Sequence, residues 1–365
     1  VTAISTIDKL SYSSDTTVAS PSVLSVTRLG SAGVSARANA LPLINLNFAT
    51  KFTDSTLSPN TGYFGGGTPG TGSVSTMDKV TYSSDTTAAV PGARLSAARY
   101  RVSATGSSIA GYFGGGRIPS GSAYSTMDKL TYSTDTTAAS PGANLSAARY
   151  TLAATGSSTA GYFGGGQPGP SVSTMDKVTY SSDTTAAVPG ASLSVARSGL
   201  AATGSSTAGY FGGGTNNTAA TVSTMDKLIY STDTTTAVPG AALSAARDRL
   251  AATGNFTAGY FGGGAPGPVT AMDKVTYSTD TRTTVPGASL SATRYGPAAT
   301  GSSTVGYFGG GQPGPVSTMD KVTYSLDTTA AVPGAALSAA RYTLAASSAR
   351  ANTLPQPTYS APFLV

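Results

Sequence analysis

The chain alternates short apolar stretches with runs of Gly, Ser, Thr and Asp, and the same pattern returns along most of its length. One unit predicts four short β-strands, which we name A, B, C and D and place at residues 151–155, 160–165, 175–181 and 186–191. Gly-Ser-Ser joins A to B and Asp-Thr-Thr joins C to D, and both sequences suit tight turns. The proline in strand D removes a donor from the ladder, so we expect D at the outer edge of each sheet.

The repeats can be counted from two landmarks. The sequence Gly-Tyr-Phe-Gly-Gly-Gly occurs six times and an Asp-Lys pair occurs seven times, centred on Asp8, Asp78, Asp128, Asp176, Asp226, Asp273 and Asp320. From Asp78 onward the spacing is 47 to 50 residues, and the variation lies in the loop between strands B and C. This period is typical of β-propeller blades, so the sequence predicts an all-β, seven-bladed propeller with four antiparallel strands per blade.

Strand B carries Tyr and Phe at consecutive positions, for example Tyr112 and Phe113. Neighbouring side chains on a strand point to opposite faces of the sheet, so both faces must be covered, as they are when a blade lies between two others. The Asp-Lys pair, for example Asp78 and Lys79, and the arginine represented by Arg99 recur in every unit. We interpret the Asp-Lys pair as part of a repeated strand-C bonding or salt-bridge ladder, and the arginines as spokes that tie adjacent blades together.

Ring closure is predicted from the mismatch between seven Asp-Lys pairs and six Gly-Tyr-Phe-Gly-Gly-Gly copies. We expect a single domain over 1–365, with the N- and C-terminal strands sharing one blade: C and D from the start of the chain, and A and B from its end. Residues 36–58 form an irregular insertion, and residues 348–365 form a closing segment or arm. The insertion is interpreted either as a loop over the closure seam or as an arm that joins subunits in a homo-oligomer.

Composition removes many kinds of chemistry. The 365 residues include no Cys and no His, and no Glu is present, so disulfides, Cys/His zinc sites and Ser-His-Asp triads are excluded. No apolar run is long enough to span a membrane, and we expect no cofactor. The chain begins with Val and shows no signal peptide, which suggests a fragment or a processed product.

Charge is balanced within each repeat, and the net charge of +6 comes from residues outside the repeated frame. The positive ones are Arg37, Lys51, Arg94, Arg101, Arg117, Arg249, Arg282 and Arg350, offset by Asp54 and Asp248. They occupy scattered repeat positions and form no basic run with interleaved aromatics, so nucleic-acid binding is not expected. The Asp-Lys pair occurs once per blade, whereas a catalytic pair is needed once, so we expect no enzyme activity.

The variable loops between strands B and C are the better candidates for binding. They are neutral and rich in Gly, Pro, Ser, Thr and Asn, which suits contacts with glycans or protein backbones, although they can also be read as permissive turns. The residues that break their uniformity are the predicted contact positions: Arg117, Ile118, Tyr124, Asn216 and Asn217.

The unit resembles the kelch repeat, in which an aromatic-hydrophobic-Gly-Gly strand is followed by a strand ending in Tyr and then by a closing Arg. Tyr162-Phe163-Gly164-Gly165, Tyr180 and Arg197 match that order, whereas the Trp usual near the C–D turn is replaced by Ala. The match covers nearly the whole chain outside residues 36–58 and the last part of the C-terminus. Copper oxidase chemistry, found in some kelch-like proteins, needs Cys and His and does not carry over.

More narrowly, the array is similar to kelch-like repeats in virion structural proteins of tailed phages that infect marine bacteria and cyanobacteria. This resemblance implies a non-enzymatic virion protein at the particle surface, such as a tail fibre or receptor-binding protein. Its partners would be other virion proteins, or a host surface glycan or protein. The alternative is a secreted or cell-surface bacterial adhesin, or a lectin-like, carbohydrate-binding propeller.

Overall fold

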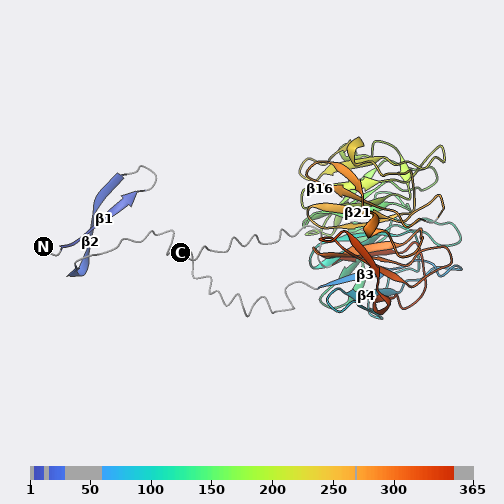
Figure 1. Cartoon of the computed structure of the whole chain (residues 1–365), viewed down its shortest axis with the longest axis horizontal. Helices are drawn as coiled ribbons and strands as arrows, with labels where there is room; N and C mark the ends of the chain where they lie inside the picture. The colour runs from blue at the N-terminus through green and yellow to red at the C-terminus, as the bar shows by residue number, and fades with distance from the viewer. Residues whose placement is uncertain (1–3, 12–15, 29–59, 268, 349–365) are drawn as a thin grey trace. The chain divides into compact units, whose positions relative to one another are not determined.

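The computed structural model describes residues 4–11, 16–28, 60–267 and 269–348. The chain divides into two units, Val1–Asp54 and Ser55–Val365. In the first unit, β1 (Ile4–Ser11) and β2 (Thr16–Arg28) pair as an antiparallel hairpin (Figure 1). The second unit contains the other strands that the structure describes.

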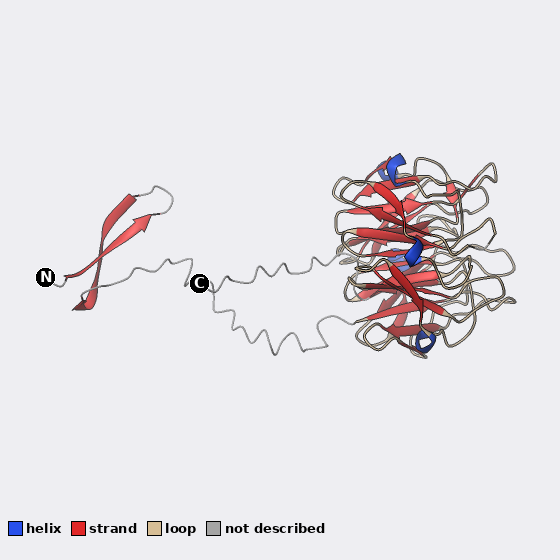
Figure 2. Ribbon diagram, viewed as in Figure 1, coloured by secondary structure: helices blue, strands red, loops and turns tan. Residues whose placement is uncertain are grey.

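The second unit is a propeller of six blades, each a four-stranded antiparallel sheet (Figures 1 and 2). Blade 1 contains β28 (Ala345–Ser348), β3 (Thr61–Gly65), β4 (Met77–Thr81) and β5 (Thr86–Ala89). Blade 2 contains β6 (Ser103–Gly106), β7 (Ala110–Gly114), β8 (Met127–Thr131) and β9 (Thr136–Ala139). Blade 3 contains β10 (Ala153–Gly156), β11 (Ala160–Gly164), β12 (Met175–Thr179) and β13 (Thr184–Ala187).

The other three blades repeat this plan. Blade 4 contains β15 (Ala201–Gly204), β16 (Ala208–Gly212), β18 (Met225–Ile229) and β19 (Thr234–Ala237). Blade 5 contains β20 (Ala251–Gly254), β21 (Ala258–Gly262), β22 (Met272–Thr276) and β23 (Thr281–Thr284). Blade 6 contains β24 (Ala298–Gly301), β25 (Val305–Gly309), β26 (Met319–Thr323) and β27 (Thr328–Ala331). A short pair, β14 (Arg197–Ser198) and β17 (Thr215–Asn216), lies outside the blades.

The prediction of seven blades is wrong, because the ring closes without the first Asp-Lys repeat. Strand β28 pairs directly with β3, so blade 1 takes its inner strand from the end of the chain and its other three strands from residues 61–89. The inner strands then contact one another in a closed order: β28, β6, β10, β15, β20, β24 and back to β28. The repeat around Asp8 instead forms the separate β1–β2 hairpin. The predicted insertion 36–58 and residues 349–365 lie outside the described residues.

Strand D is the outer strand of every blade, as predicted, but it is shorter than expected. In blade 3 it ends at Ala187, and Pro189 begins a 3-10 turn, η2 (Pro189–Ala191). Proline suits the first position of a helical turn because its missing N–H has no partner to lose there. The same turn follows strand D in four other blades, as η1 (Pro141–Ala143), η3 (Pro239–Ala241), η4 (Pro286–Ala288) and η5 (Pro333–Ala335), and the turns are drawn as helices in Figure 2.

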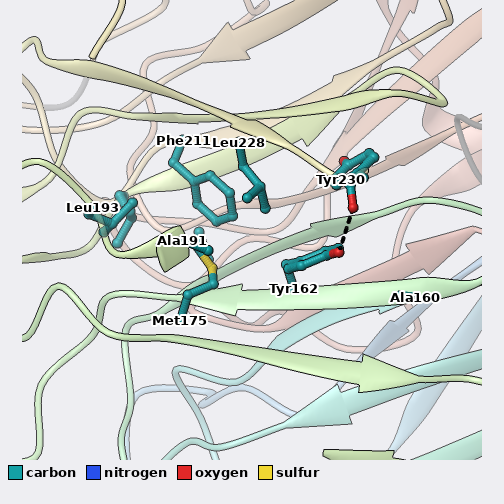
Figure 3. Packing of buried hydrophobic residues seen from close by; sticks show 10 residues of the cluster. Ala160, Tyr162, Met175, Ala191, Leu193, Phe211, Leu228 and Tyr230 are labelled. Carbon is teal, nitrogen blue, oxygen red and sulfur yellow. Dashed lines mark hydrogen bonds between the residues drawn. The ribbon is translucent and has the colours of Figure 1, made fainter. Parts of the chain in front are cut away.

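The consecutive Tyr and Phe of strand B cover opposite faces of each blade. Tyr162 packs with Phe211 and Leu228 of blade 4, and its ring stacks on that of Tyr230 at a centroid distance of 5.2 Å (Figure 3). Phe163, the next residue, packs instead against Tyr112 of blade 2. The side chains of Tyr162 and Phe163 are almost entirely buried, so each blade is held from both sides by the hydrophobic effect.

Buried Arg–Asp pairs fix each inter-blade connection. Arg149, at the end of the connection from blade 2, donates a 2.6 Å hydrogen bond to Asp176 of blade 3 and another to the backbone oxygen of Phe163. Burial lowers the pKa of the Arg149 guanidinium, and the charge of Asp176 opposes that effect. The six equivalent pairs are Arg99–Asp128, Arg149–Asp176, Arg197–Asp226, Arg247–Asp273, Arg294–Asp320 and Arg341–Asp78.

A second set of ion pairs links the blades through their C–D turns. Lys129 of blade 2 lies 2.7 Å from Asp183 of blade 3, and the Tyr112 hydroxyl donates to the same carboxylate. Burial alone would raise the pKa of Asp183, but hydrogen bonds from Lys129 and Tyr112 and the charge of Lys129 lower it below its usual range. The equivalent pairs are Lys79–Asp135, Lys129–Asp183, Lys177–Asp233, Lys227–Asp280, Lys274–Asp327 and Lys321–Asp85.

Candidate functional site at the axial mouth

The inner end of each inter-blade connection contributes one residue to a closed ring of backbone hydrogen bonds around the propeller axis. Each of these residues donates its N–H to the carbonyl oxygen of its counterpart in the preceding blade, over 2.6 to 3.1 Å. All have left-handed φ values of 50° to 70°. The six residues are Arg101, Thr151, Gly199, Arg249, Gly296 and Thr343.

The ring places residues of different blades at predictable positions. Arg101 begins blade 2 and Arg249 begins blade 5, so they stand three places apart in a ring of six and face each other across the axis. Together with residues from all six blades they line a cavity of about 70 Å³ at this end of the inner strands. That volume has room for one or two water-sized groups, since a water occupies roughly 30 Å³ in the liquid. We call this region the axial mouth and include Tyr100, Arg101, Arg117, Tyr150, Asp248, Arg249 and Tyr295 in it.

Arg117 is brought to the mouth by the backbone. Tyr100 and Arg117 exchange two backbone hydrogen bonds, of 2.9 and 3.1 Å, which fix the start of the B–C loop against the inter-blade connection. A second bridge, from Arg117 to Ala123, folds that loop into a small hairpin. Arg117 is the first residue of its B–C loop and directly follows the triple glycine. The equivalent residue is Gln167 in blade 3 and Gln312 in blade 6.

Two arginines and two tyrosines form a cationic cluster on one side of the mouth. The Arg117 guanidinium lies 4.7 Å from the Tyr150 ring centroid and 5.9 Å from that of Tyr100. The Arg101 guanidinium lies 5.6 and 5.5 Å from the same two rings. Such contacts are attractive cation–π interactions that hold each guanidinium over a ring face.

Neither guanidinium has an anionic partner among residues 60–267 and 269–348. No hydrogen bond or ion pair joins the side chain of Arg101 or Arg117 to this part of the chain, and the Nε atom of Arg117 is buried without a hydrogen-bond acceptor. Burial lowers the pKa of Arg101; the positive charges of Arg117 and Arg249 lower it further, and Tyr100 and Tyr150 partly oppose them. Among the residues that the structure describes, the positive charge of this cluster is therefore not compensated.

The opposite side of the mouth is partly neutralised. Arg249 lies 3.3 Å from the carboxylate of the adjacent Asp248, and its guanidinium lies 4.5 Å from the Tyr295 ring centroid. The surplus charge of the mouth therefore sits beside blades 2 and 3, at Arg101 and Arg117.

The sequence-predicted contact residues have different surroundings. Arg117 belongs to the mouth, and the half-buried Ile118 and Tyr124 lie in the same B–C loop. The Asn217 side chain bonds both the N–H and the carbonyl of Ser171 in the neighbouring loop, at 2.6 and 3.0 Å. The Asn216 side chain accepts three hydrogen bonds within its own loop, from Thr218 and Ala220. These two asparagines therefore hold loop structure two blades away from Arg117.

Arg101 and Arg249 were missed by the sequence reasoning, which treated the surplus arginines as scattered. In space, three of them meet at the mouth because the inter-blade connections converge on the axis. The signal lies in the residue two places after the repeated arginine, which is Arg, Thr, Gly, Arg, Gly and Thr in successive blades, among otherwise near-identical sequences. The repeated positions Asp78, Lys79, Arg99, Tyr112 and Phe113 lie instead in the blade-to-blade contacts described above.

A second, larger cavity of about 490 Å³ lies between the A–B turns of blades 2 and 3. Ile109, the most exposed large apolar residue of the described part, lines it together with Ser, Thr and Tyr180. Its one charged group, Lys177, is already paired with Asp233 at 2.8 Å. This cavity therefore offers no charge to select a ligand.

The described part of the chain contains no group of three metal-ligating side chains, and no helix there is both long and apolar enough to cross a bilayer. Comparison with models of protein families and with curated proteins gives no match to this chain. The similarity to kelch repeats and to phage virion proteins therefore rests on the repeat alone.

Proposed function

We propose that this propeller is a non-enzymatic binding module at the surface of a phage particle, in its tail or fibre. It would bind a host surface glycan or protein, or a neighbouring virion protein. The observation that supports a binding role is that charged residues inside and outside the repeated frame have different surroundings. The repeated Arg–Asp and Lys–Asp pairs bind the blades to one another, whereas three of the arginines outside the repeated frame, Arg101, Arg117 and Arg249, gather at the axial mouth.

The phage setting is supported by the resemblance of the repeat. Near-identical repeats form a rigid scaffold, and loops of variable sequence on such a scaffold are where binding residues usually lie. The alternative, a secreted adhesin or lectin-like propeller, uses the same mouth and loops and differs in its assembly.

The binding role can be tested with the full chain on an array of bacterial surface polysaccharides. Retention of one saccharide class, reduced by exchanging the 117–123 loop for the shorter blade 3 loop, supports a binding module. An array without retention, combined with failure to label intact host-type cells, would contradict it.

The virion setting predicts a symmetric assembly through residues 36–58. Light scattering should then give a trimer or hexamer for the full chain and a monomer for the chain lacking those residues. A monomer in both cases removes the proposed arm and favours the secreted alternative.

A further inference from the structure

We propose that the Arg101–Arg117 cluster is a binding site for an oxyanion group, such as the carboxylate or sulfate of an acidic saccharide. This inference names the ligand class of the proposed binding module and in that sense rests on it. Arg101 lines the axial cavity, and the Arg117 guanidinium lies over the same two tyrosine rings as that of Arg101. No other blade has arginine at both of these positions.

The positive charge of the site is not compensated within the described residues. Each of the six repeated arginines between the blades is paired with a buried aspartate, whereas Arg101 and Arg117, which lie outside the repeated frame, are held over the rings of Tyr100 and Tyr150. Two like charges held close together destabilise one another, and an anion between them removes that cost. Guanidinium groups also match the geometry of carboxylate and sulfate oxygens, because their N–H donors are arranged as a planar fork.

The two guanidinium groups are held in place before a ligand arrives. The Arg117 backbone is fixed by its two hydrogen bonds to Tyr100, and the Arg101 N–H is fixed in the axial ring by the carbonyl of Thr343 at 2.7 Å. The Tyr100 and Tyr150 rings then limit the motion of both side chains. Since little side-chain freedom remains to be lost, binding an anion is less costly than it would be at exposed, mobile arginines.

The size of the cavity favours a single small group. The axial cavity of about 70 Å³ is lined by Arg101 and Arg249 and otherwise by small or aliphatic residues. It can accept one charged group, while the rest of a saccharide would lie outside, over the tyrosines and the B–C loops. Arg249 across the axis adds attraction, but Asp248 weakens it.

The repeat itself supplies substitutions that should not disturb folding. Blade 3 has Thr151 and Gln167 where blade 2 has Arg101 and Arg117, and the backbones of the two blades match in the ring and the bridge. The double variant Arg101→Thr/Arg117→Gln therefore gives the mouth of blade 2 the residues of blade 3. The matched control is Arg94→Asn, which removes an exposed arginine outside the repeated frame and introduces the residue found as Asn144 at the same position after strand D of blade 2.

The test is isothermal titration calorimetry on the full chain with trigalacturonate, its methyl ester and sodium sulfate as probes. We expect trigalacturonate or sulfate to bind, the neutral ester to bind at least about tenfold more weakly than the acid, and affinity to fall with added salt. The double variant should lose about tenfold or more in affinity while keeping the β-sheet circular dichroism of the parent, and Arg94→Asn should bind like the parent.

The possible results of these titrations distinguish failure of the oxyanion site from failure of the proposed binding function. Binding of sulfate alone, lost in the double variant, upholds the oxyanion site but counts against a saccharide ligand. Equal binding of the acid and the ester, unaffected by the double variant, overturns the oxyanion site and leaves a binding module in place. No heat with either anion at millimolar concentrations also overturns the inference.

Discussion

Arg341 and Asp78 lie 263 residues apart in the sequence, yet a guanidinium nitrogen of Arg341 is 2.5 Å from the Asp78 carboxylate, and both side chains are buried. The pair joins the last inter-blade connection to the first full blade of the ring. Arg149 and Asp176 form the same contact, at 2.6 Å, within the middle of the chain. Closing the ring therefore uses the same contact that links blades elsewhere.

Replacement of Arg341 by Met is expected to destabilise the propeller by about 3–5 kcal/mol, because Asp78 would remain buried without its partner. Arg149→Met should cost a similar amount, since its geometry is the same. The double variant Arg341→Met/Asp78→Asn should recover part of the loss, because no buried charge is then left alone. Denaturant unfolding monitored by circular dichroism measures all three. A double variant less stable than Arg341→Met would contradict this account of the pair.

Alkaline pH is expected to unfold the ring through its buried tyrosines. Burial raises the pKa of twelve tyrosines, two at each blade interface, above the ordinary value near 10. The unfolded chain loses these protons from about pH 10, whereas the folded chain keeps them. Their contribution to stability is therefore complete below about pH 10 and decreases as the pH rises above it.

A spectrophotometric titration followed by circular dichroism checks this prediction. Most of the tyrosinate absorbance should appear in one cooperative step together with the loss of β-structure. Gradual ionisation of all tyrosines near pH 10, with the β-sheet signal retained, would mean that these hydroxyls are exposed to solvent.

Some residues of the axial ring have unfavourable backbone conformations. We therefore expect substitutions at two ring positions to change the stability of the fold in opposite directions. Thr343 has a φ of 50°, a region that suits glycine and disfavours β-branched residues, whereas Gly296 already meets this need with a φ of 66°. We expect Thr343→Gly to stabilise the fold by up to about 1 kcal/mol and Gly296→Val to destabilise it by about 1–3 kcal/mol. Equilibrium unfolding of both variants decides the point. A stability loss for Thr343→Gly as large as that for Gly296→Val would show that the ring residues are not strained.

Much of a single blade was predictable from the repeat. The four strands, the outer position of strand D and the opposite faces of Tyr162 and Phe163 follow from turn chemistry, from proline and from the two-residue period of a strand. These are local properties, and every copy of the repeat contains the residues that determine them.

The number of blades was not predictable by counting Asp-Lys pairs. A blade also needs a strand B, which packs on both neighbours, and only six Gly-Tyr-Phe copies exist to supply one. The six-bladed ring is complete because Ala345–Ser348 pairs with Thr61–Gly65, a contact between distant segments that no local pattern specifies. The axial mouth was not predicted for a similar reason. Arg101 and Arg249 are 148 residues apart in sequence, and only the symmetry of the ring places them opposite each other across the axis.

The most direct test of the six-bladed ring compares the thermal unfolding of the full chain with that of a chain beginning at Ser55, using a chain ending at Leu344 as the contrasting variant. If the ring has six blades, removing residues 1–54 leaves the unfolding temperature of the propeller unchanged. Removing β28 should lower that temperature strongly, because blade 1 loses its inner strand. A large loss of stability in the chain beginning at Ser55 would contradict the six-bladed ring and show that the N-terminal repeat belongs to it.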